Sequence, residues 1–396
     1  MKRSRRLVFV SGYRLTGHGG GIASSRSYYF ALRELFPGPI ALVSSEEDRS
    51  VIMDPSRETF VGIPKSGSLK KIVTVLSRRS LDRMSPEADR WLLNNLQQED
   101  LLFVNGAVIG RLCALVGKKN RCQNTILVHH NVERDYFSTN GGGIIKQMLL
   151  NGISEKNQRE GYRAAWCNLF LTEPDRERCR FLYGPSLGFS LVCPTFLPED
   201  LSELPLIKQE LNFQKNLNIL VSGTLYAPQF EEPFMEFLQQ EWQTFRKLFP
   251  DSRLTVAGFS PSSRLKRASE QYGFTLVPDP KEMDDLYREA NIYLSLTYGG
   301  SGKKYRLMEP LRWGLPIVSH VHSLAGYEEI KGSRWVFPFS NSESLLKAFS
   351  EIEGRSSMSL SERQEVQSSF FDHYSFRRGK EKMRSLLAPL MEEKKT

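Results

Sequence analysis

The sequence predicts an α/β protein built from two doubly wound domains, each with parallel strands covered by helices. Short apolar segments alternate with longer amphipathic ones along the chain, and this pattern breaks off and restarts near the middle. With 396 residues the chain has the length of about two domains, and its 40% apolar and 11% aromatic residues can fill two cores. We therefore expect domains at 1–200 and 217–370, joined by a linker at 201–216.

Strand-like and helical segments alternate through the first half. Pro174 and Asp175 suit the first turn of a helix that follows one of these strands. The strands are expected at 7–12, 101–106, 125–131, 168–173 and 189–196. The helices are expected at 25–36, 107–117, 144–166 and 174–184.

The second half repeats the alternation after the polar, charged linker. Its strands are expected at 217–223, 252–259, 274–279, 291–298, 315–321 and 334–339. Its helices are expected at 234–249, 262–272, 281–290 and 342–354. The final residues, 371–396, are expected to form a helix that packs back across the domain boundary. Ligands of doubly wound sheets bind at the carboxyl ends of strands, so we expect a substrate between the domains.

The amino-acid composition narrows the class of protein. The formal charge is +9, and residues 1–200 hold 28 Lys and Arg against 20 Asp and Glu, which suits nucleic acid, an anionic membrane or an acidic substrate. An ordinary basic surface is the alternative. The apolar run Leu7–Val10 is too short for a secretion signal, and no run of about 18 apolar residues predicts a membrane span. Five cysteines without metal-type spacing favour free thiols, so we expect a cytoplasmic protein.

A glycine-rich loop follows the first strand. The stretch TGHGGGIASS, Thr16–Ser25, leads from that strand into a helix. Gly19, Gly20 and Gly21 let the backbone approach a phosphate or sugar closely, and the helix start supplies N–H donors. Gly223 stands at the end of the first strand of the second half and fits a close approach to a diphosphate. For both places an ordinary tight turn is the alternative.

Two histidines end another strand of the first half. His129 and His130 could hydrogen-bond a polar ligand at the edge of the sheet. Glu133 or Asp135 could accept a hydrogen bond from a hydroxyl group of that ligand. A zinc site would need further ligands at suitable spacing, and none occurs. For either histidine, a structural role in the core is the alternative.

A cluster of cations and one acid opens a helix in the second half, in the stretch GGSGKKYRLMEPLRWG. Lys303, Lys304 and Arg306 can neutralise a diphosphate, because charge-assisted hydrogen bonds to phosphate oxygens are strong. Glu309, one turn into the helix, suits the two hydroxyls of a ribose instead. The alternative is a solvated basic helix start with a stabilising acid.

Together these segments resemble the GT-B glycosyltransferases, particularly the retaining group called family 4. The likeness covers nearly the whole chain and is strongest over 218–320, where SGTLYAPQFEEPFMEFL, RLTVAGFSPS, VPDPKEMDDLYREANIYLSL and GGSGKKYRLMEPLRWGLPIVS keep the family's order and spacing. In the first half, the glycine loop, HHNVERDYF and LTEPDRERCRFLYG are also similar to the family. The resemblance implies two Rossmann-like domains facing across a cleft. The N-terminal domain would lie on the acceptor side, and the C-terminal domain would bind the nucleotide sugar.

The resemblance also implies roles for particular residues. Glu309 corresponds to the glutamate that binds the donor's ribose, and His129 or His130 to the residue that contacts the transferred sugar. Lys304 and Arg306 are the nearest candidates to neutralise the leaving diphosphate. The loops corresponding to those around the donor's diphosphate and sugar contain Gly19, Gly20, Gly21, Gly223, Thr224, Gly300, Ser301, Gly302 and Lys303.

Two departures from the family pattern favour a second reading of the function. Ser301 stands where many relatives have the first of two glutamates, and the loop after Gly223 reads TLYAPQ where many have an arginine and a lysine. Relatives with a similar glycine loop also lack that first glutamate. The alternative function is a non-catalytic GT-B subunit that binds glycan or supports a partner glycosyltransferase. Nucleic-acid binding, suggested by the charge alone, is a third reading, and a sugar-nucleotide epimerase of related fold is a further one.

The expected reaction is transfer of a sugar from a nucleotide diphosphate sugar to a glycan or lipid-linked acceptor, with retention, in polysaccharide or glycoconjugate synthesis. No Asp-x-Asp pair stands at a strand end, so neither a metal ion nor another cofactor is expected. The segment 68–84, basic with one apolar face, suits the anionic inner face of a membrane, and a core-packed helix is its alternative. Without a recognition motif, no nucleic-acid partner is expected.

Overall fold

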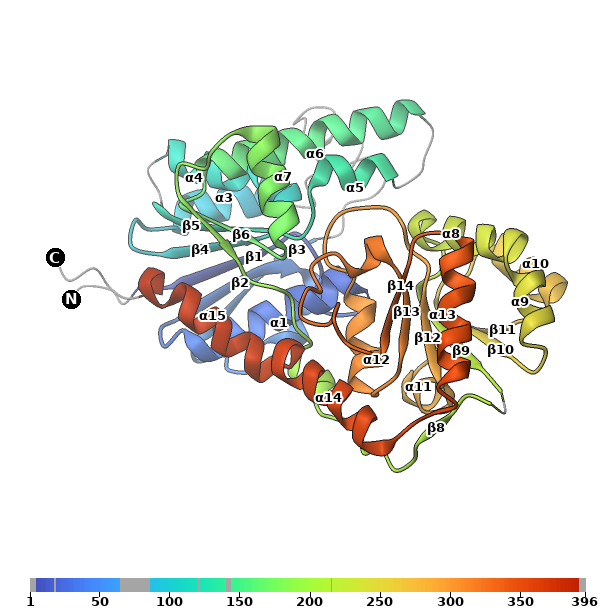
Figure 1. The fold of residues 1–396 in the computed structure, drawn as a ribbon. Helices are drawn as coiled ribbons and strands as arrows, with labels where there is room; N and C mark the ends of the chain where they lie inside the picture. Colours follow the sequence, from blue (N-terminus) through green and yellow to red (C-terminus); the bar gives the residue numbers. More distant parts are fainter. Residues whose placement is uncertain are drawn as a thin grey trace. The chain divides into compact units, whose positions relative to one another are not determined.

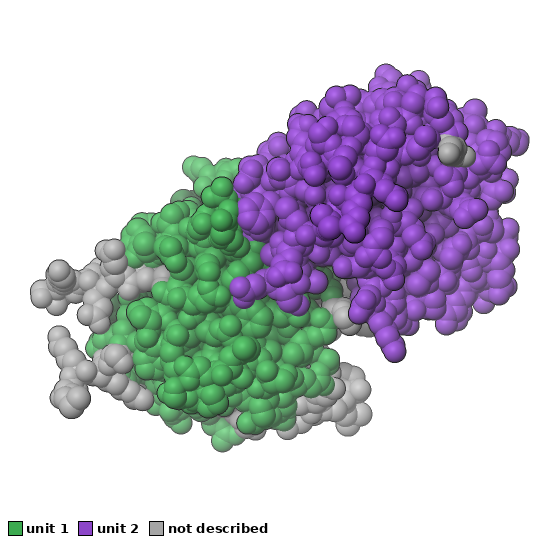
Figure 2. Space-filling view, turned by 90° about the horizontal axis from the view of Figure 1, so that it is seen from below, with its two compact units in different colours: residues 1–198, 376–396 green, residues 199–375 purple. Residues whose placement is uncertain are grey.

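The chain divides into two compact units (Figures 1 and 2), each described by itself below. The computed structural model describes residues 5–17, 19–64, 86–119, 122–139, 144–214 and 216–391. Unit 1 comprises residues 1–198 and 376–396, and unit 2 comprises residues 199–375. The expected linker at 201–216 thus belongs to unit 2, and most of the expected C-terminal helix belongs to unit 1. The basic segment 68–84 lies outside the described residues.

Unit 1 is built on a parallel sheet of seven strands in the order β3-β2-β1-β4-β5-β6-β7. The strands are β1 Leu7–Ser11, β2 Ile40–Ser45, β3 Glu58–Ile63, β4 Leu101–Asn105, β5 Asn124–His129, β6 Cys167–Phe170 and β7 Phe189–Val192. The first six follow the strand order of a dinucleotide-binding fold, whose switch point lies between the first and fourth strands. In unit 1 this point is the carboxyl edge of β1 and β4.

Helices flank the sheet of unit 1 (Figure 1). They are α1 Gly20–Leu35, α3 Pro86–Asn95, α4 Arg111–Lys118, α5 Glu133–Thr139, α6 Ile144–Ala164, α7 Glu173–Tyr183 and α15 Phe376–Met391, with short 3-10 helices at Glu46–Val51 and Ala107–Ile109. The start of α7 follows the expectation from sequence: Thr172 caps it by accepting from the Asp175 N–H, and a proline stands in the first turn.

The inner strands of unit 1 bury both faces, which explains their continuous apolar runs. On one face, Leu7 and Phe9 of β1 pack in a cluster with side chains of α1 and α15. On the other face, Val8 and Val10 pack in a cluster with side chains of α3 and α4. The C-terminal helix is therefore part of the core of unit 1, because Phe376, Met383 and Leu387 of α15 lie in the first cluster.

Unit 2 has a six-stranded parallel sheet in the order β11-β10-β9-β12-β13-β14. Its strands are β9 Asn218–Thr224, β10 Arg253–Phe259, β11 Thr275–Pro278, β12 Ile292–Ser295, β13 Ile317–His320 and β14 Val336–Phe339. Its helices are α8 Pro228–Gln240, α9 Trp242–Leu248, α10 Ser263–Tyr272, α11 Asp284–Glu289, α12 Met308–Arg312, α13 Ser342–Gly354 and α14 Leu360–Tyr374. Short 3-10 helices span Glu199–Leu201, Tyr305–Leu307 and Val321–Leu324, and β8 Leu211–Asn212 pairs with β15 Ser357–Met358.

The predicted α/β class with two doubly wound domains is confirmed. The sequence analysis missed β2 and β3. The edge strand β3 begins with Glu58, a buried carboxylate that accepts from the Met53 N–H at 2.8 Å, the Asp54 N–H at 2.9 Å and the Tyr29 hydroxyl at 3.0 Å. Such a paired acid interrupts the apolar pattern by which a buried strand is found. Within the described ranges, no helix combines the length and apolar character needed to cross a membrane.

Candidate functional site

The switch point of unit 2 lies at the carboxyl edge of β9 and β12, where a doubly wound sheet binds its ligand. Gly223 and Thr224 are the last two residues of β9, and the chain turns there as the Ala227 N–H donates to the Thr224 carbonyl at 3.1 Å. The loop after β12 carries the predicted cations and leads into the 3-10 helix Tyr305–Leu307 and α12. The fold therefore gathers these sequence-predicted residues at one edge of one sheet.

Arg306 reaches the end of β9. A Cβ atom at Gly223 would lie 3.3 Å from Arg306 Nη1 and 2.9 Å from Phe230 Cδ2, so only glycine lets both side chains approach this backbone without displacement. The guanidinium lies 5.9 Å from the centroid of the Phe230 ring. Burial lowers the Arg306 pKa from its ordinary value, yet an arginine stays protonated in proteins. To the described residues Arg306 makes no hydrogen bond and no ion pair, so its charge is available to an anion.

Lys304 holds its own loop together. Its Nζ donates to the carbonyls of Gly300 at 3.2 Å, Ser301 at 3.1 Å and Gly302 at 3.4 Å. Both glycines have a φ of 80°, a left-handed conformation that residues with a side chain rarely adopt. Without a Cβ at these two positions, the loop can take this conformation without strain.

Lys303 is buried against two tyrosine rings. Its Nζ lies 4.3 Å from the Tyr327 ring centroid and 4.5 Å from the Tyr374 ring centroid, an arrangement that stabilises a desolvated cation. The Tyr327 hydroxyl also donates to the Lys304 carbonyl at 2.8 Å. The loop after β12 is thereby fixed to α14. Of the three predicted cations, Lys303 and Lys304 have contacts within unit 2, and Arg306 is the one directed at β9.

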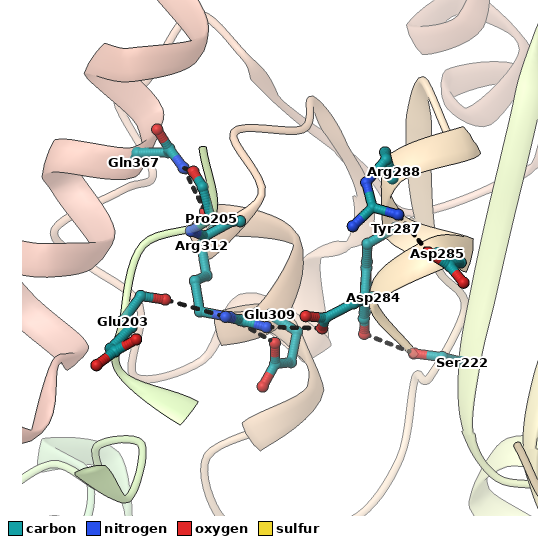
Figure 3. Close-up of polar contacts among 10 residues, drawn as sticks. All are labelled: Glu203, Pro205, Ser222, Asp284, Asp285, Tyr287, Arg288, Glu309, Arg312 and Gln367. Carbon is teal, nitrogen blue, oxygen red and sulfur yellow. Dashed lines mark hydrogen bonds and ion pairs between the residues drawn. The ribbon is translucent and has the colours of Figure 1, made fainter. Parts of the chain in front are cut away.

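Glu309 lies in α12 beside a cation that the sequence analysis missed (Figure 3). Arg312 Nε donates to Glu309 Oε2 at 3.0 Å, and its Nη2 donates to Asp284 Oδ1 at 3.0 Å. Burial raises the Glu309 pKa, and the Arg312 charge opposes that rise. The spacing of three residues on a helix was the available signal, because side chains at i and i+3 share a face.

In unit 1 the glycine loop lies at the corresponding switch point. Gly19 has a φ of 125° and precedes α1, which begins with Gly20 and Gly21. A buried acid that the sequence analysis missed fixes the preceding loop: Asp48 Oδ1 accepts from the Leu15 N–H at 3.0 Å and the Thr16 N–H at 2.9 Å. The glycines thus begin a helix, as the sequence predicted, and a phosphate or sugar site there stays a prediction.

His129 is enclosed by the core of unit 1. Its Nε2 lies 2.8 Å from Asn168 Oδ1, and Gln158 Nε2 lies 3.0 Å from its Nδ1. The ring stacks on Phe170 with centroids 4.4 Å apart. Burial lowers the His129 pKa to about 4, so the imidazole is neutral at neutral pH. These contacts satisfy both ring nitrogens.

His130 lies beside the loop that follows β1. Its Nε2 is 2.8 Å from Asn105 Oδ1, and its ring centroid is 5.0 Å from that of Tyr13. Because Asn105 Nδ2 donates to Ser25 Oγ at 2.7 Å, the Asn105 oxygen accepts and His130 Nε2 carries the proton. Burial lowers the His130 pKa to about 3. The pair of histidines therefore divides into one ring inside the core and one ring beside the switch point.

The described residues include no group of three or more His, Cys, Asp or Glu side chains that could hold a metal ion. No protein-family model matches the sequence, and a search of curated proteins finds no significant match.

Solved structures similar to the chain span both units. One is HepE from Anabaena in complex with UDP, with 9% identity and a TM-score of 0.66 over 98% of this chain and 100% of HepE. Another is α,α-trehalose-phosphate synthase (UDP-forming) from Burkholderia vietnamiensis, with 10% identity and a TM-score of 0.66 over 98% of this chain and 97% of that one. A third, a trehalose-6-phosphate synthase used to study glycosyltransfer with retention, has 13% identity and a TM-score of 0.61 over 98% of this chain and 99% of the other.

At such low identities the similarity establishes the fold alone. Because each similar structure is matched along nearly its full length, the likeness includes both sheets and their order along the chain. The chain therefore has the GT-B fold of two Rossmann-like units.

Proposed function

We propose that the chain is a glycosyltransferase that takes a sugar from a nucleoside diphosphate sugar. The observation that carries the proposal is the partly buried Arg306 guanidinium beside Gly223, at the switch point of unit 2 and without a protein anion among the described residues. A diphosphate supplies two neighbouring negative charges that a guanidinium binds well. HepE is bound to UDP and the Burkholderia vietnamiensis synthase is UDP-forming, which supports a nucleoside diphosphate as the ligand class.

In this proposal Arg306 and Glu309 bind different parts of one donor. The two residues are three positions apart, so the diphosphate would meet Arg306 and the ribose hydroxyls would meet the Glu309 carboxylate. Departure of the diphosphate leaves a cationic sugar, and Arg306 would stabilise the charge that grows on the leaving group. Lys304 would act through the shape of its loop, whose backbone borders the same edge.

We assign the contact with the transferred sugar to His130. Its position beside Tyr13 and Asn105 supports this role, while Asn168, Gln158 and Phe170 enclose His129. The acceptor oxygen would pass its proton to the departing phosphate, which suits a neutral His130 with a low pKa. The finer parts of the proposal rest on the sequence: retention, membership of family 4, and a glycan or lipid-linked acceptor in polysaccharide synthesis. No metal or other cofactor is included, and the chain is proposed to act in the cytoplasm, peripherally at the membrane.

The test measures transfer and donor hydrolysis with a panel of UDP, GDP, ADP and dTDP sugars. Replacing Arg306 with alanine should lower kcat by about 100-fold or more, the typical loss when one group that stabilises developing charge is removed. Arg306→Lys should retain part of the rate because it keeps the charge. The control is Arg288→Ala, which removes an exposed arginine of α11 paired with Asp285. Wild-type turnover by the Arg306→Ala variant would refute the assignment.

The alternative is a non-catalytic subunit that binds glycan or supports a partner enzyme. Ser301 favours this alternative, because its side chain has no carboxylate and its backbone carbonyl accepts a hydrogen bond from Lys304 Nζ. Binding of a donor without transfer or hydrolysis by the pure chain would favour this alternative.

A further inference from the structure

Arg312 is a buried arginine whose three guanidinium nitrogens each have one acceptor. Nε donates to Glu309 Oε2, Nη2 to Asp284 Oδ1 and Nη1 to the Glu203 carbonyl, each at 3.0 Å. Its side chain is 8% exposed, against 18% for Glu309 and 53% for Asp284. One side chain of α12 therefore joins α11, α12 and the segment around Glu203 near the start of unit 2 (Figure 3).

The backbone of Arg312 strengthens the same junction. Gln367 Nε2 of α14 donates to the Arg312 carbonyl at 2.8 Å and to the Pro205 carbonyl at 3.0 Å. Arg312 is thus held from its carbonyl and from all three side-chain nitrogens. A guanidinium fixed in this way has one orientation, and so has the carboxylate oxygen that it binds.

This arrangement leaves the two oxygens of Glu309 unequal. Oε2 accepts from Arg312, whereas Oε1 has no hydrogen bond to any described residue. In Figure 3 one carboxylate oxygen of Glu309 points away from Arg312. The carboxylate therefore presents one directed acceptor rather than two equal ones.

We propose that Arg312 is a positioning residue, which keeps Glu309 ionised and turns its Oε1 toward a hydroxyl of the donor's ribose. The inference rests on the proposed function, because it takes the ligand of Glu309 to be a nucleoside diphosphate. It adds a residue to that site, and it joins the site to the Glu203–Pro205 segment.

The charges around Glu309 explain why a cation is needed there. The titratable groups near its carboxylate are Arg312 on the same helix, Asp284 and Tyr287 of α11, Asp200 of the 3-10 helix at 199–201, and Tyr293 of β12. Burial and both aspartates raise the Glu309 pKa, and Arg312 lowers it. Loss of this arginine would leave two neighbouring carboxylates without their shared cation, which favours protonation of Glu309.

The first test is a double-mutant cycle on binding of UDP, with GDP, ADP and dTDP tried in parallel. Arg312→Lys and Glu309→Gln should each weaken binding by about tenfold or more, the range for a hydrogen bond to a charged group. The double variant should bind as weakly as Glu309→Gln alone, because Arg312 acts through Glu309. Effects that multiply in the double variant would overturn the proposal.

A matched control separates positioning from general support. Arg363 is also buried, and it donates to the carbonyls of Gly314 at 3.3 Å, Gln209 at 2.8 Å and Trp313 at 2.9 Å, without a carboxylate. Arg363→Lys should change the dissociation constant by the same factor with or without Glu309→Gln. If Arg363→Lys instead reproduced the non-additivity of Arg312→Lys, the role of Arg312 would be structural only.

The second test does not need a ligand. The Glu309 carboxyl carbon is followed by NMR in the ligand-free protein between pH 4 and 8, with Glu309→Gln to assign its signal. Arg312→Met should raise the pKa of Glu309, whereas Arg363→Met should leave it unchanged. An unchanged Glu309 titration in Arg312→Met would overturn the proposal. If the wild type bound none of UDP, GDP, ADP and dTDP, the donor site itself would be refuted, while this titration would still decide the role of Arg312.

Discussion

At the scale of the residue, adjacent side chains in the same motif have separate environments. His129 is the last residue of β5, and His130 follows it in the bend after the strand. One ring packs on Phe170, and the other lies near Tyr13. Both hydrogen-bond an asparagine side chain, and both remain neutral because burial lowers their pKa values to about 4 and about 3. Both rings are therefore buried, but they have different neighbours, and His130 is the one that we propose as a site residue.

The low pKa values of His129 and His130 make the free energy of unfolding depend on pH. Their pKa values in the folded chain lie below the ordinary value of 6.5, so the unfolded chain binds protons first as the pH falls. The free energy of unfolding should therefore drop below pH 6.5, by about 2 kcal/mol for each histidine between pH 6.5 and 5.

Denaturant unfolding at several pH values checks this dependence. His129→Gln should flatten the slope between pH 6.5 and 5, and the exposed His373 provides the control through His373→Gln. A slope unchanged by His129→Gln would contradict the low pKa of this residue.

At the scale of the element, side-chain contacts fix the conformation of the loop after β12. Lys304 bonds three carbonyls of the loop, His322 Nε2 lies 2.5 Å from the Gly300 carbonyl, and Lys303 rests on the rings of Tyr327 and Tyr374. A ligand that binds at this edge, as we propose, would meet a loop whose shape is already set. Less conformational entropy is then lost on binding.

Because Lys304 fixes this loop, we expect its loss to destabilise the loop locally. Lys304→Met should remove the hydrogen bonds to the three carbonyls, lower the stability of unit 2 by about 1–3 kcal/mol and speed amide exchange in residues 300–304. Hydrogen exchange with mass spectrometry measures this change. Lys266→Met, at an exposed position of α10, is the control and should leave the exchange unaltered. Equal protection of the loop in Lys304→Met and the wild type would contradict the prediction.

Most strands that lie inside a sheet were predictable from sequence, although β2, which is also interior and buried, was missed. β1, β4, β5, β9 and β10 lie inside their sheets and read as apolar runs, so their positions were expected correctly. The edge strand β3 was not predicted because a paired acid interrupts its apolar pattern. The final helix was predicted as one continuous helix, but α14 ends before Ser375 and α15 begins after it. Local sequence does not reveal which polar groups will find partners.

At the scale of the whole molecule, both units repeat one strand order, with the first strand in the middle of the sheet. This order brings the end of β9 beside the loop after β12, which explains how Gly223 meets Arg306 across a long stretch of sequence. The residue types of the site were predictable from spacing and charge. Tertiary contacts decide three features that the sequence did not predict. These are the contact between Gly223 and Arg306, the different partners of the three cations, and the hydrogen bond from Arg312 to Glu309. That the domains face each other across a cleft stays a prediction.

The core position of α15 predicts a unit-specific loss of stability. Met383 is fully buried in the core of unit 1, and Met383→Ala should lower the stability of that unit by about 2–5 kcal/mol. Calorimetry should show the transition of unit 1 at a lower temperature and that of unit 2 unmoved. The neighbouring exposed Lys382 gives the control, since Lys382→Ala should change stability by about 0.5 kcal/mol or less. Equal displacement of both transitions would contradict this prediction.

The position of α15 in the sequence affects the order in which the two units can fold during translation. Residues 7–198 are translated before unit 2, yet Phe376, Met383 and Leu387, which pack in their core, are translated after it. Unit 2 is contiguous in sequence and can finish folding while the earlier unit still exposes the apolar surface awaiting its missing helix. At ordinary translation rates that interval lasts on the order of tens of seconds. A nascent chain arrested before residue 376 would therefore expose apolar surface of unit 1, and we expect it to be prone to aggregation.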